Sequence, residues 1–401
     1  MWLFCNLKNI RGFDMNEPIN ENGYIIYGAG KMSKSALQFA TCLGLLVVGF
    51  CDSNKLVVSS IEDLPIITPY ELDMLISNNK IMGIIIGSSI YDDEIYEKLL
   101  RYVEVIKVIK FHEIQKQYIN TVGYRLKDNV TEEYIINYKE QINIWIDNLM
   151  SEVEFWACET ASPKGKNHSS YISRIESSND QFICDRLKMQ VDEKTIILDV
   201  GCGIFSKYGK YKGESRLSLE GIDPLAHFYN KINEHYGISE IVRFGLFEFL
   251  SIFVENSQVD VILIDNALDH CIDPYKSILE CLKVLKVGGC LSTRHRRCEA
   301  LFENFQGLHK WNIDVDDDNN IIIWNLENKI NVSKKLEQYV DIETVYSEAD
   351  EMLEIAFILK NEIPKEYYVK ENEMLLAFIL ERLMNKYADS NNRLFEEMLG
   401  L

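Results

Sequence analysis

Histidine and acidic side chains that could move a proton lie in the second half of the chain, each just beyond a short apolar segment. Imidazole has an unperturbed pKa of about 6.5, so it can accept the proton of a hydroxyl group near neutral pH. His295 and His309 are the first candidates for this base, and Asp269 and His270 are the second choice. These residue types predict a pocket in which a substrate hydroxyl is activated.

A glycine-rich turn precedes these residues in the chain. The segment from Ile196 to Val200 has the length and β-branched content of a buried parallel strand, and it runs directly into Gly201-Cys202-Gly203. Glycines at such a turn allow the backbone to approach a bound ligand closely. Asp223 follows at the distance of about 20 residues that places an acid beside the ribose hydroxyls of a nucleoside. The spacing therefore predicts a cofactor-binding turn.

Further strands and a helix complete this half of the chain. Val259 to Ile264 is typical of a buried strand, Tyr275 to Leu285 of a helix, and Cys290 to Thr293 of the next strand. Asp341 to Tyr346 and Leu353 to Leu359 are expected to form a final antiparallel pair. In sheets of this type ligands bind beyond the carboxyl ends of the parallel strands. The histidines and acids that follow those strands are therefore expected in one pocket.

The order of these motifs resembles that of the class I S-adenosylmethionine-dependent methyltransferases, over roughly residues 195 to 360. Four ordered stretches carry the resemblance: Asp199 to Gly203, Gly221 to Pro224, Asn266 to His270 and Val284 to Gly289. The resemblance implies an enzyme with a seven-stranded α/β sheet and with S-adenosylmethionine as its cofactor.

The resemblance also implies which residues contact the cofactor. These are Asp199, Gly201, Cys202, Gly203, Asp223, Leu246, Phe247, Asn266 and Ala267. Asp223 would accept hydrogen bonds from both ribose hydroxyls, since a carboxylate can accept two at once. Asn266 lies where the family contacts the methionine portion. Leu246 stands where relatives often carry an acid for the adenine amino group, so Leu246 and Phe247 would hold adenine by apolar contact.

The segment after the strand Cys290 to Thr293 does not belong to the general methyltransferase pattern. It resembles a bacterial subgroup in which a histidine, an acid and a Gly-x-His-x-Trp-Asn run follow this strand, often beside genes for surface sugars or small metabolites. The predicted acceptor contacts are Arg174, Glu299, Trp311 and Asn312. Arg174 would bind an anionic group.

A metal is a further use for this segment. His295 and Glu299 lie four residues apart and would share a helix face, which also suits a divalent metal with His309 as a third ligand. Because this spacing is common by chance, no metal ligand is assigned.

A second glycine-rich turn lies near the start of the sequence. Tyr24 to Tyr27 is typical of a strand, and the next predicted strand ends at Asp52, which is the βαβ pattern of a nucleotide site. The candidate nucleotide contacts are Gly28, Gly30, Lys31 and Asp52. This stretch looks like the small Rossmann-like domains that accompany bacterial sugar-modifying enzymes, although Ser33 replaces the usual third glycine. Alternatively, the glycines only form a tight turn in a domain used for assembly.

The chain of 401 residues is long enough for two hydrophobic cores, since single cores seldom exceed about 250–300 residues. The predicted fold class is α/β, with two Rossmann-like three-layer domains. The predicted boundaries are 1–115 for a Rossmann-like nucleotide-binding-like domain, 116–170 for a helical connector or lid, 171–362 for the methyltransferase domain and 363–401 for a helical extension. Such an extension often packs between subunits, which favours a homodimer.

The whole-chain properties restrict the partners. A formal net charge of −20 argues against a nucleic-acid substrate, because phosphates are normally met by clustered Lys and Arg. No apolar run approaches the roughly 20 residues needed to span a bilayer. A cytoplasmic protein with a small-molecule substrate is expected.

The sequence thus predicts transfer of a methyl group to a small acceptor, most simply a hydroxyl of a sugar or nucleotide-linked sugar in surface-polysaccharide or metabolite biosynthesis. Two alternatives stay open: methylation of nitrogen or carbon in a specialised metabolite, and a non-catalytic protein that uses both nucleotide-like domains for binding or assembly.

Overall fold

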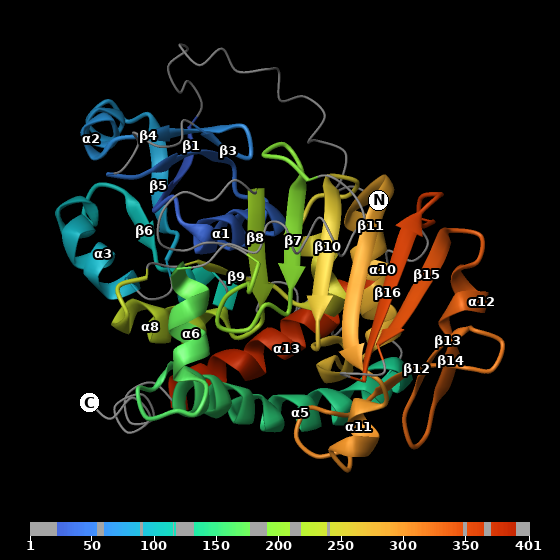
Figure 1. The fold of residues 1–401 in the computed structure, drawn as a ribbon. Coiled ribbons are helices and arrows are strands. Elements are labelled where there is room, and N and C mark those ends of the chain that lie inside the picture. Colours follow the sequence, from blue (N-terminus) through green and yellow to red (C-terminus); the bar gives the residue numbers. More distant parts are fainter. Residues whose placement is uncertain are drawn as a thin grey trace. The chain divides into compact units, whose positions relative to one another are not determined.

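The chain folds into two units, Met1–Tyr118 and Ile119–Leu401. The computed structural model describes residues 22–53, 60–88, 91–114, 116–117, 132–176, 191–208, 218–238, 241–347, 351–364 and 370–389. Each unit is built on an α/β sheet (Figure 1). The predicted fold class is confirmed, including the seven-stranded sheet of the second unit. No helix within the described ranges combines the length and the apolar character needed to cross a membrane.

The first unit contains a six-stranded sheet in the order β3-β4-β2-β1-β5-β6. Its strands are β1 (Gly23–Tyr27), β2 (Val47–Cys51), β3 (Ser60–Ile61), β4 (Leu64–Ile67), β5 (Ile81–Ile86) and β6 (Lys107–Ile109). All neighbouring pairs are parallel except β3 with β4. The strand order changes direction between β1 and β5, which is the point where open α/β sheets bind their ligands.

Helices in this unit follow the predicted alternation with the strands. They are α1 (Lys31–Cys42), α2 (Pro69–Ser77), α3 (Asp92–Leu99) and the 3₁₀ turn η2 (Leu100–Tyr102). β5 is rich in isoleucine and almost wholly buried, as expected of a parallel strand that is covered on both faces.

The second unit contains a seven-stranded sheet in the order β15-β16-β11-β10-β7-β8-β9. Its strands are β7 (Ile196–Val200), β8 (Ser218–Asp223), β9 (Val242–Phe244), β10 (Val259–Asp265), β11 (Leu285–Arg296), β15 (Val340–Ser347) and β16 (Met352–Leu359). The five strands from β7 to β11 run parallel, and β16 is antiparallel to both β11 and β15. The order reverses between β7 and β10, so the glycine turn after β7 lies at the switch point.

The helices of this unit begin before its first strand. They are α5 (Glu132–Glu154), the π-helix η3 (Phe155–Ala161), α6 (His168–Glu176), α8 (Ala226–His235), η4 (Phe247–Phe249), α9 (Leu250–Phe253), η5 (Leu268–His270), α10 (Pro274–Val284), α11 (Glu299–Phe302), α12 (Val332–Leu336) and α13 (Lys370–Asp389). α10 begins where predicted because Pro274 follows Asp273, whose carboxylate caps the helix by accepting from Lys276 N at 3.0 Å.

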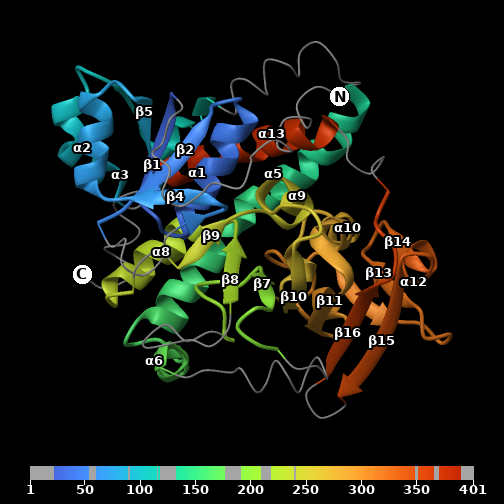
Figure 2. The ribbon, with the colours of Figure 1, turned by 90° about the horizontal axis from the view of Figure 1, so that it is seen from above.

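The predicted connector and C-terminal extension are both helical and lie side by side as α5 and α13 (Figures 1 and 2). Arg382 on α13 donates a hydrogen bond to Asn143 on α5 at 2.8 Å, and Lys386 pairs with Asp147 at 3.3 Å. The extension therefore packs on a helix of its own chain, and the homodimer stays a prediction.

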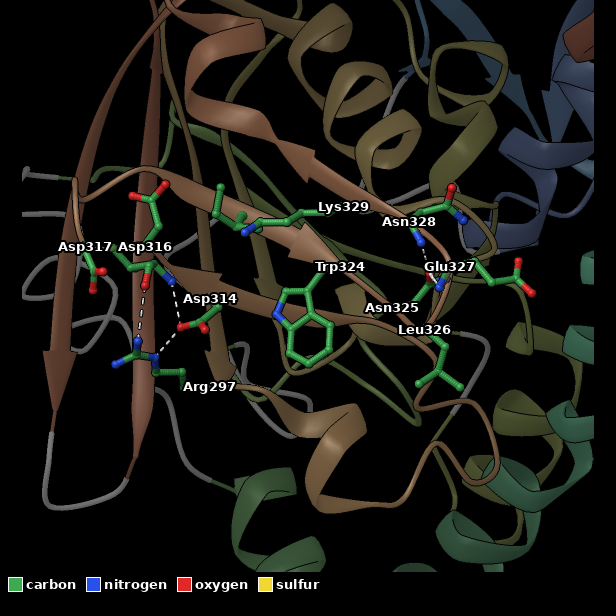
Figure 3. A pocket seen from close by; sticks show the side chains of 12 residues that line it. Arg297, Asp314, Asp316, Asp317, Trp324, Asn325, Leu326, Glu327, Asn328 and Lys329 are labelled. Carbon is green, nitrogen blue, oxygen red and sulfur yellow. Dashed lines mark hydrogen bonds and ion pairs between the residues drawn. The ribbon is translucent and has the colours of Figure 1, made fainter.

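A small antiparallel sheet is inserted between β11 and β15. It contains β12 (Asn312–Val315), β13 (Ile321–Trp324) and β14 (Lys329–Asn331). A shallow hollow of about 660 Å³ lies on this sheet, where Arg297 pairs with Asp314 beside Trp324 (Figure 3). None of the predicted site residues lines this hollow.

Candidate active site

The glycine turn after β7 has a backbone that other residues would adopt only under strain. Gly201 and Gly203 have φ values of +73° and +65°, in the left-handed region. A Cβ atom at Gly201 would lie 2.5 Å from the Phe247 ring and 2.7 Å from the Ala267 side chain. The turn therefore lets three chain segments approach one another, as expected of a ligand-binding turn.

Asp223, at the carboxyl end of β8, is tied to this turn. Its carboxylate accepts hydrogen bonds from the backbone N–H groups of Gly203 at 3.0 Å and Leu225 at 2.8 Å. Burial raises the pKa of Asp223 to about 7, although both hydrogen bonds favour the ionised form. The acid thus lies beside the glycine turn, at the carboxyl end of the strand next to β7, where hydroxyl groups of a ligand would stabilise its ionised form further.

A cavity of about 490 Å³ opens beside the turn, within the size range of small-molecule sites. Every predicted cofactor residue lines it, namely Asp199, Gly201, Cys202, Gly203, Asp223, Leu246, Phe247, Asn266 and Ala267. Glu248 also lines the cavity, but its carboxylate accepts from the N–H groups of Ile272 and Asp273 just before α10. Glu248 therefore positions the chain ahead of that helix.

Three polar side chains meet at the same cavity. His309 Nδ1 lies 2.7 Å from Asp269 Oδ2 and 3.1 Å from His270 Nε2. Asp269 and His270 belong to η5 directly after β10, and His309 lies in the loop between α11 and β12. Both histidines line the cavity, whereas Asp269 is buried behind them. All three are among the candidate bases predicted from the sequence, and the structure brings them together.

The electrostatics of this cluster are set by mutual contact. Burial alone would raise the pKa of Asp269, but nearby His270 and the hydrogen bond from His309 outweigh it and lower that pKa. Burial would lower the pKa of His309, but Asp269 and the charges of Glu299 and Glu152 raise it overall. For Glu299, burial and then the charge of Asp269 raise the pKa. The pair Asp269 and His309 therefore holds a proton firmly between two polar atoms.

Helix α5 contacts His270 through two of its side chains. Trp145 Nε1 donates a hydrogen bond to the backbone carbonyl of His270 at 2.8 Å, and Glu152 Oε1 lies 3.9 Å from His270 Nδ1. The spacing of Trp145 and Glu152 puts these side chains on one face of α5, and Trp156 follows in the π-helix η3; all three line the cavity. A Cβ atom at Gly203 would lie 2.7 Å from the Trp156 ring, so the glycine turn packs directly on this wall.

The structure brings only some of the remaining predicted residues to the cavity. Glu299 and Arg174 line the cavity, but His295, Trp311 and Asn312 do not. His295 is only 1% exposed within β11. Asn312 accepts a hydrogen bond from Leu301 N at 2.9 Å and so holds α11.

The expectation that His295 and Glu299 share a helix face is wrong. β11 continues to Arg296, well beyond the predicted end at Thr293, because it pairs with β16 over seven residues, from Cys290 to Arg296. Glu299 begins the separate helix α11.

Several lining residues were missed by sequence reasoning. Lys207 lies 2.6 Å from Asp265 Oδ2 at the end of β10, and both line the cavity. The position of Asp265 at a strand end was the available signal. Phe155 and Trp156 come from the π-helix, a distortion that often marks functional sites. The sequence predicted this segment only as part of the helical connector or lid over residues 116–170.

In the first unit, the glycine turn after β1 is hydrogen-bonded to the predicted acid, Asp52. Asp52 Oδ2 accepts a hydrogen bond from Ala29 N at 2.9 Å, and Gly28 has a φ of +105°. The missing third glycine has a substitute directly after β5, since a Cβ atom at Gly87 would lie 2.8 Å from Ser33 Cβ. Gly30 caps α1, and the side chain of Lys31 lies outside the described part of the chain.

Comparison with known proteins adds an independent finding. Residues 198–293 match the family model described as a methyltransferase domain. No curated protein matches the chain. Similar solved structures include the PH0226 protein from Pyrococcus horikoshii OT3, with 13% identity, 51% of this chain and 98% of that chain covered and a TM-score of 0.32. The CurJ carbon methyltransferase is 14% identical, with 66% of this chain and 80% of that chain covered and a TM-score of 0.35. The N-methyltransferase NodS from Bradyrhizobium japonicum WM9, in complex with S-adenosyl-L-homocysteine, is 13% identical, with 48% of this chain and 88% of that chain covered and a TM-score of 0.31.

The strand order, the glycine turn and the family match define a class I S-adenosylmethionine-dependent methyltransferase domain in the second unit. The protein is an S-adenosylmethionine-dependent methyltransferase, and S-adenosylmethionine is its cofactor. The residues present fit S-adenosylmethionine. A Cβ atom at Gly201 would occupy the space beside the turn that the cofactor needs, and the adjacent cavity has the size of a small-molecule site.

A matched pair of glycine substitutions tests the close approach at Gly201. Gly201→Ala adds a left-handed strain of about 1–2 kcal/mol and an overpacking cost of about 1–3 kcal/mol against Phe247. Gly237 has a φ of +71°, but a Cβ atom there would meet nothing within 4 Å, so Gly237→Ala carries the strain alone. We expect only Gly201→Ala to weaken cofactor binding, by at least about tenfold. Urea unfolding and calorimetry measure both effects; equal cofactor affinities for the two variants would contradict this account.

Proposed function

We propose that the enzyme methylates a hydroxyl group of a sugar or nucleotide-linked sugar. The observation that carries the proposal is the contact between Asp269 and His309 at 2.7 Å, in the cavity that also contains the glycine turn. A nitrogen or carbon nucleophile without a proton to lose needs no such pair. A hydroxyl oxygen does need one, because it is a poor nucleophile until its proton is removed.

The chain's own residues supply a route for that proton. Asp269 accepts from His309 Nδ1, which leaves Nε2 as the ring nitrogen that can take a proton from the acceptor. His270 is held by Trp145 and borders His309, so the ring of His309 is packed in place. When bound, S-adenosylmethionine supplies a methyl group that is already activated by its sulfonium. Orientation of the acceptor and exclusion of water by Trp145 and Trp156 are then the main tasks of the protein.

The first unit supports the choice of a nucleotide-linked acceptor. Its glycine turn, the acid Asp52 and its strand order have the arrangement of nucleotide-binding sheets. The proposed contacts for the nucleotide are Gly28, Gly30, Lys31 and Asp52. We likewise propose the boundaries 1–115, 116–170, 171–362 and 363–401, a homodimer and a cytoplasmic location.

The experiment is transfer of a labelled methyl group from S-adenosylmethionine to a panel of nucleotide sugars, free sugars and amines, with the full chain. We expect the label on an oxygen atom of a sugar, located by tandem mass spectrometry. Label found only on nitrogen or carbon would favour a specialised-metabolite enzyme instead. Tight cofactor binding without transfer to any member of the panel would favour the binding or assembly role.

A further inference from the structure

The atoms of Asp269, His270 and His309 that face one another are all metal-ligand types. The separations are 2.7 Å from Asp269 Oδ2 to His309 Nδ1, 3.1 Å from His309 Nδ1 to His270 Nε2 and 3.6 Å from Asp269 Oδ2 to His270 Nε2. Donor atoms placed about 2.0–2.2 Å from a tetrahedral ion lie about 3.3–3.6 Å apart. The observed separations lie near this value, so small side-chain movements would place one ion between all three atoms.

The hydrogen-bonding capacity of the cluster points the same way. His309 Nδ1 can carry only one proton, and it faces two polar atoms, Asp269 Oδ2 and His270 Nε2. A divalent ion would satisfy all three atoms at once. Two imidazoles and one carboxylate with an open position are the ligand set of catalytic zinc and related sites.

Two carboxylates around the cluster provide independent support. Glu299 is 8% exposed, lines the cavity, and its Oε2 atom has no hydrogen-bond partner among the described residues. Glu152 lies 3.9 Å from His270 Nδ1, where an outer carboxylate would orient a ligating histidine. A cation would relieve the excess of negative charge that Asp269, Glu152 and Glu299 create together.

We propose that Asp269, His270 and His309 bind a divalent transition-metal ion, with zinc the best fit to the ligand set. The open coordination position is available to the cavity, which both histidines line. The role of the ion, unlike its binding, rests on the proposed function. The ion would bind the acceptor oxygen and lower the pKa of its hydroxyl, and Glu299 would take the proton in place of His309. The oxygen–carbon bond then forms as the carbon–sulfur bond breaks, and the electron pair stays on sulfur.

Binding is tested on the full chain with Co²⁺ in place of zinc, without cofactor or acceptor. We expect one equivalent to bind, with visible absorption bands and no thiolate-to-cobalt charge-transfer band, because the site has no sulfur ligand. His270→Ala should weaken binding at least about 100-fold, and Glu152→Gln about tenfold. The control is His235→Ala, an exposed histidine on α8, which should bind Co²⁺ like the wild type. His270→Gln serves if the alanine variant does not fold.

Absence of stoichiometric binding, or equal affinity in wild type and both His270 variants, would overturn the metal site. A thiolate band would assign the ion to cysteines and overturn it equally. The role is tested by removing metal with a chelator and measuring methyl transfer: loss of turnover that Zn²⁺ restores supports it, and unchanged turnover overturns it while leaving the proposed methyl transfer intact.

Discussion

Replacing His309 by alanine is expected to slow methyl transfer to a hydroxyl acceptor by about 10²- to 10⁴-fold, the usual contribution of a positioned base. The substitution removes the partner of Asp269 and the ring that borders the cavity. Cofactor affinity should change little, because the cofactor residues lie around Gly201 and Asp223. The measurement is single-turnover methyl transfer, with cofactor binding followed separately by calorimetry.

His235→Ala is the matched control, because His235 is exposed at the end of α8 and does not line the cavity. Full turnover by the His309 variant would mean that the nucleophile has no proton to lose. The acceptor atom would then be nitrogen or carbon, and the proposed hydroxyl acceptor would be abandoned.

Asp223→Asn is expected to weaken binding of S-adenosylmethionine and S-adenosylhomocysteine by about 100-fold or more. A hydrogen bond to a charged group contributes about 1.5–3 kcal/mol, and two ribose hydroxyls would lose their charged acceptor. The amide keeps the shape of the side chain and can still accept from the Gly203 or the Leu225 N–H group. Calorimetric titration of both ligands gives the affinity, and thermal unfolding confirms that the variant folds.

Asp260→Asn is a suitable control at the other end of the same sheet. Asp260 accepts from Ile196 N at 2.9 Å and pairs with Lys286 at 2.7 Å, away from the cavity. We expect this variant to bind the cofactor normally. Normal binding by Asp223→Asn as well would remove Asp223 from the cofactor site.

The cofactor half of the site could be predicted because its signals are local in sequence. A buried strand followed by Gly201 and Gly203, and an acid at the end of the next strand, are positioned by the sheet itself. The acceptor half depends on where elements end. β11 extends to Arg296 through its pairing with β16, which buries His295 and leaves His309 at the cavity. Nothing in the local sequence distinguishes these two histidines.

The first unit gives a similar lesson. Ser33 stands where a third glycine would allow α1 to pack closely on the sheet, and Gly87, directly after β5, provides that space instead. A motif of consecutive residues does not show that a glycine far away in the sequence provides the space that the motif lacks. The wall formed by α5 was missed for the same reason, because its contact with the glycine turn joins residues far apart in the chain.

The cavity wall formed by Trp145, Glu152 and Trp156 affects which fragment of the chain can be active. The matched residues 198–293 supply strands and turns, but Trp145, Glu152 and Trp156 come from a helix that precedes them. This helix is in turn braced by α13 through Arg382 and Asn143. A fragment trimmed to the matched residues would keep the glycine turn but lose both this wall and the lining residues Glu299 and His309. We therefore expect the smallest active fragment to extend from α5 to α13.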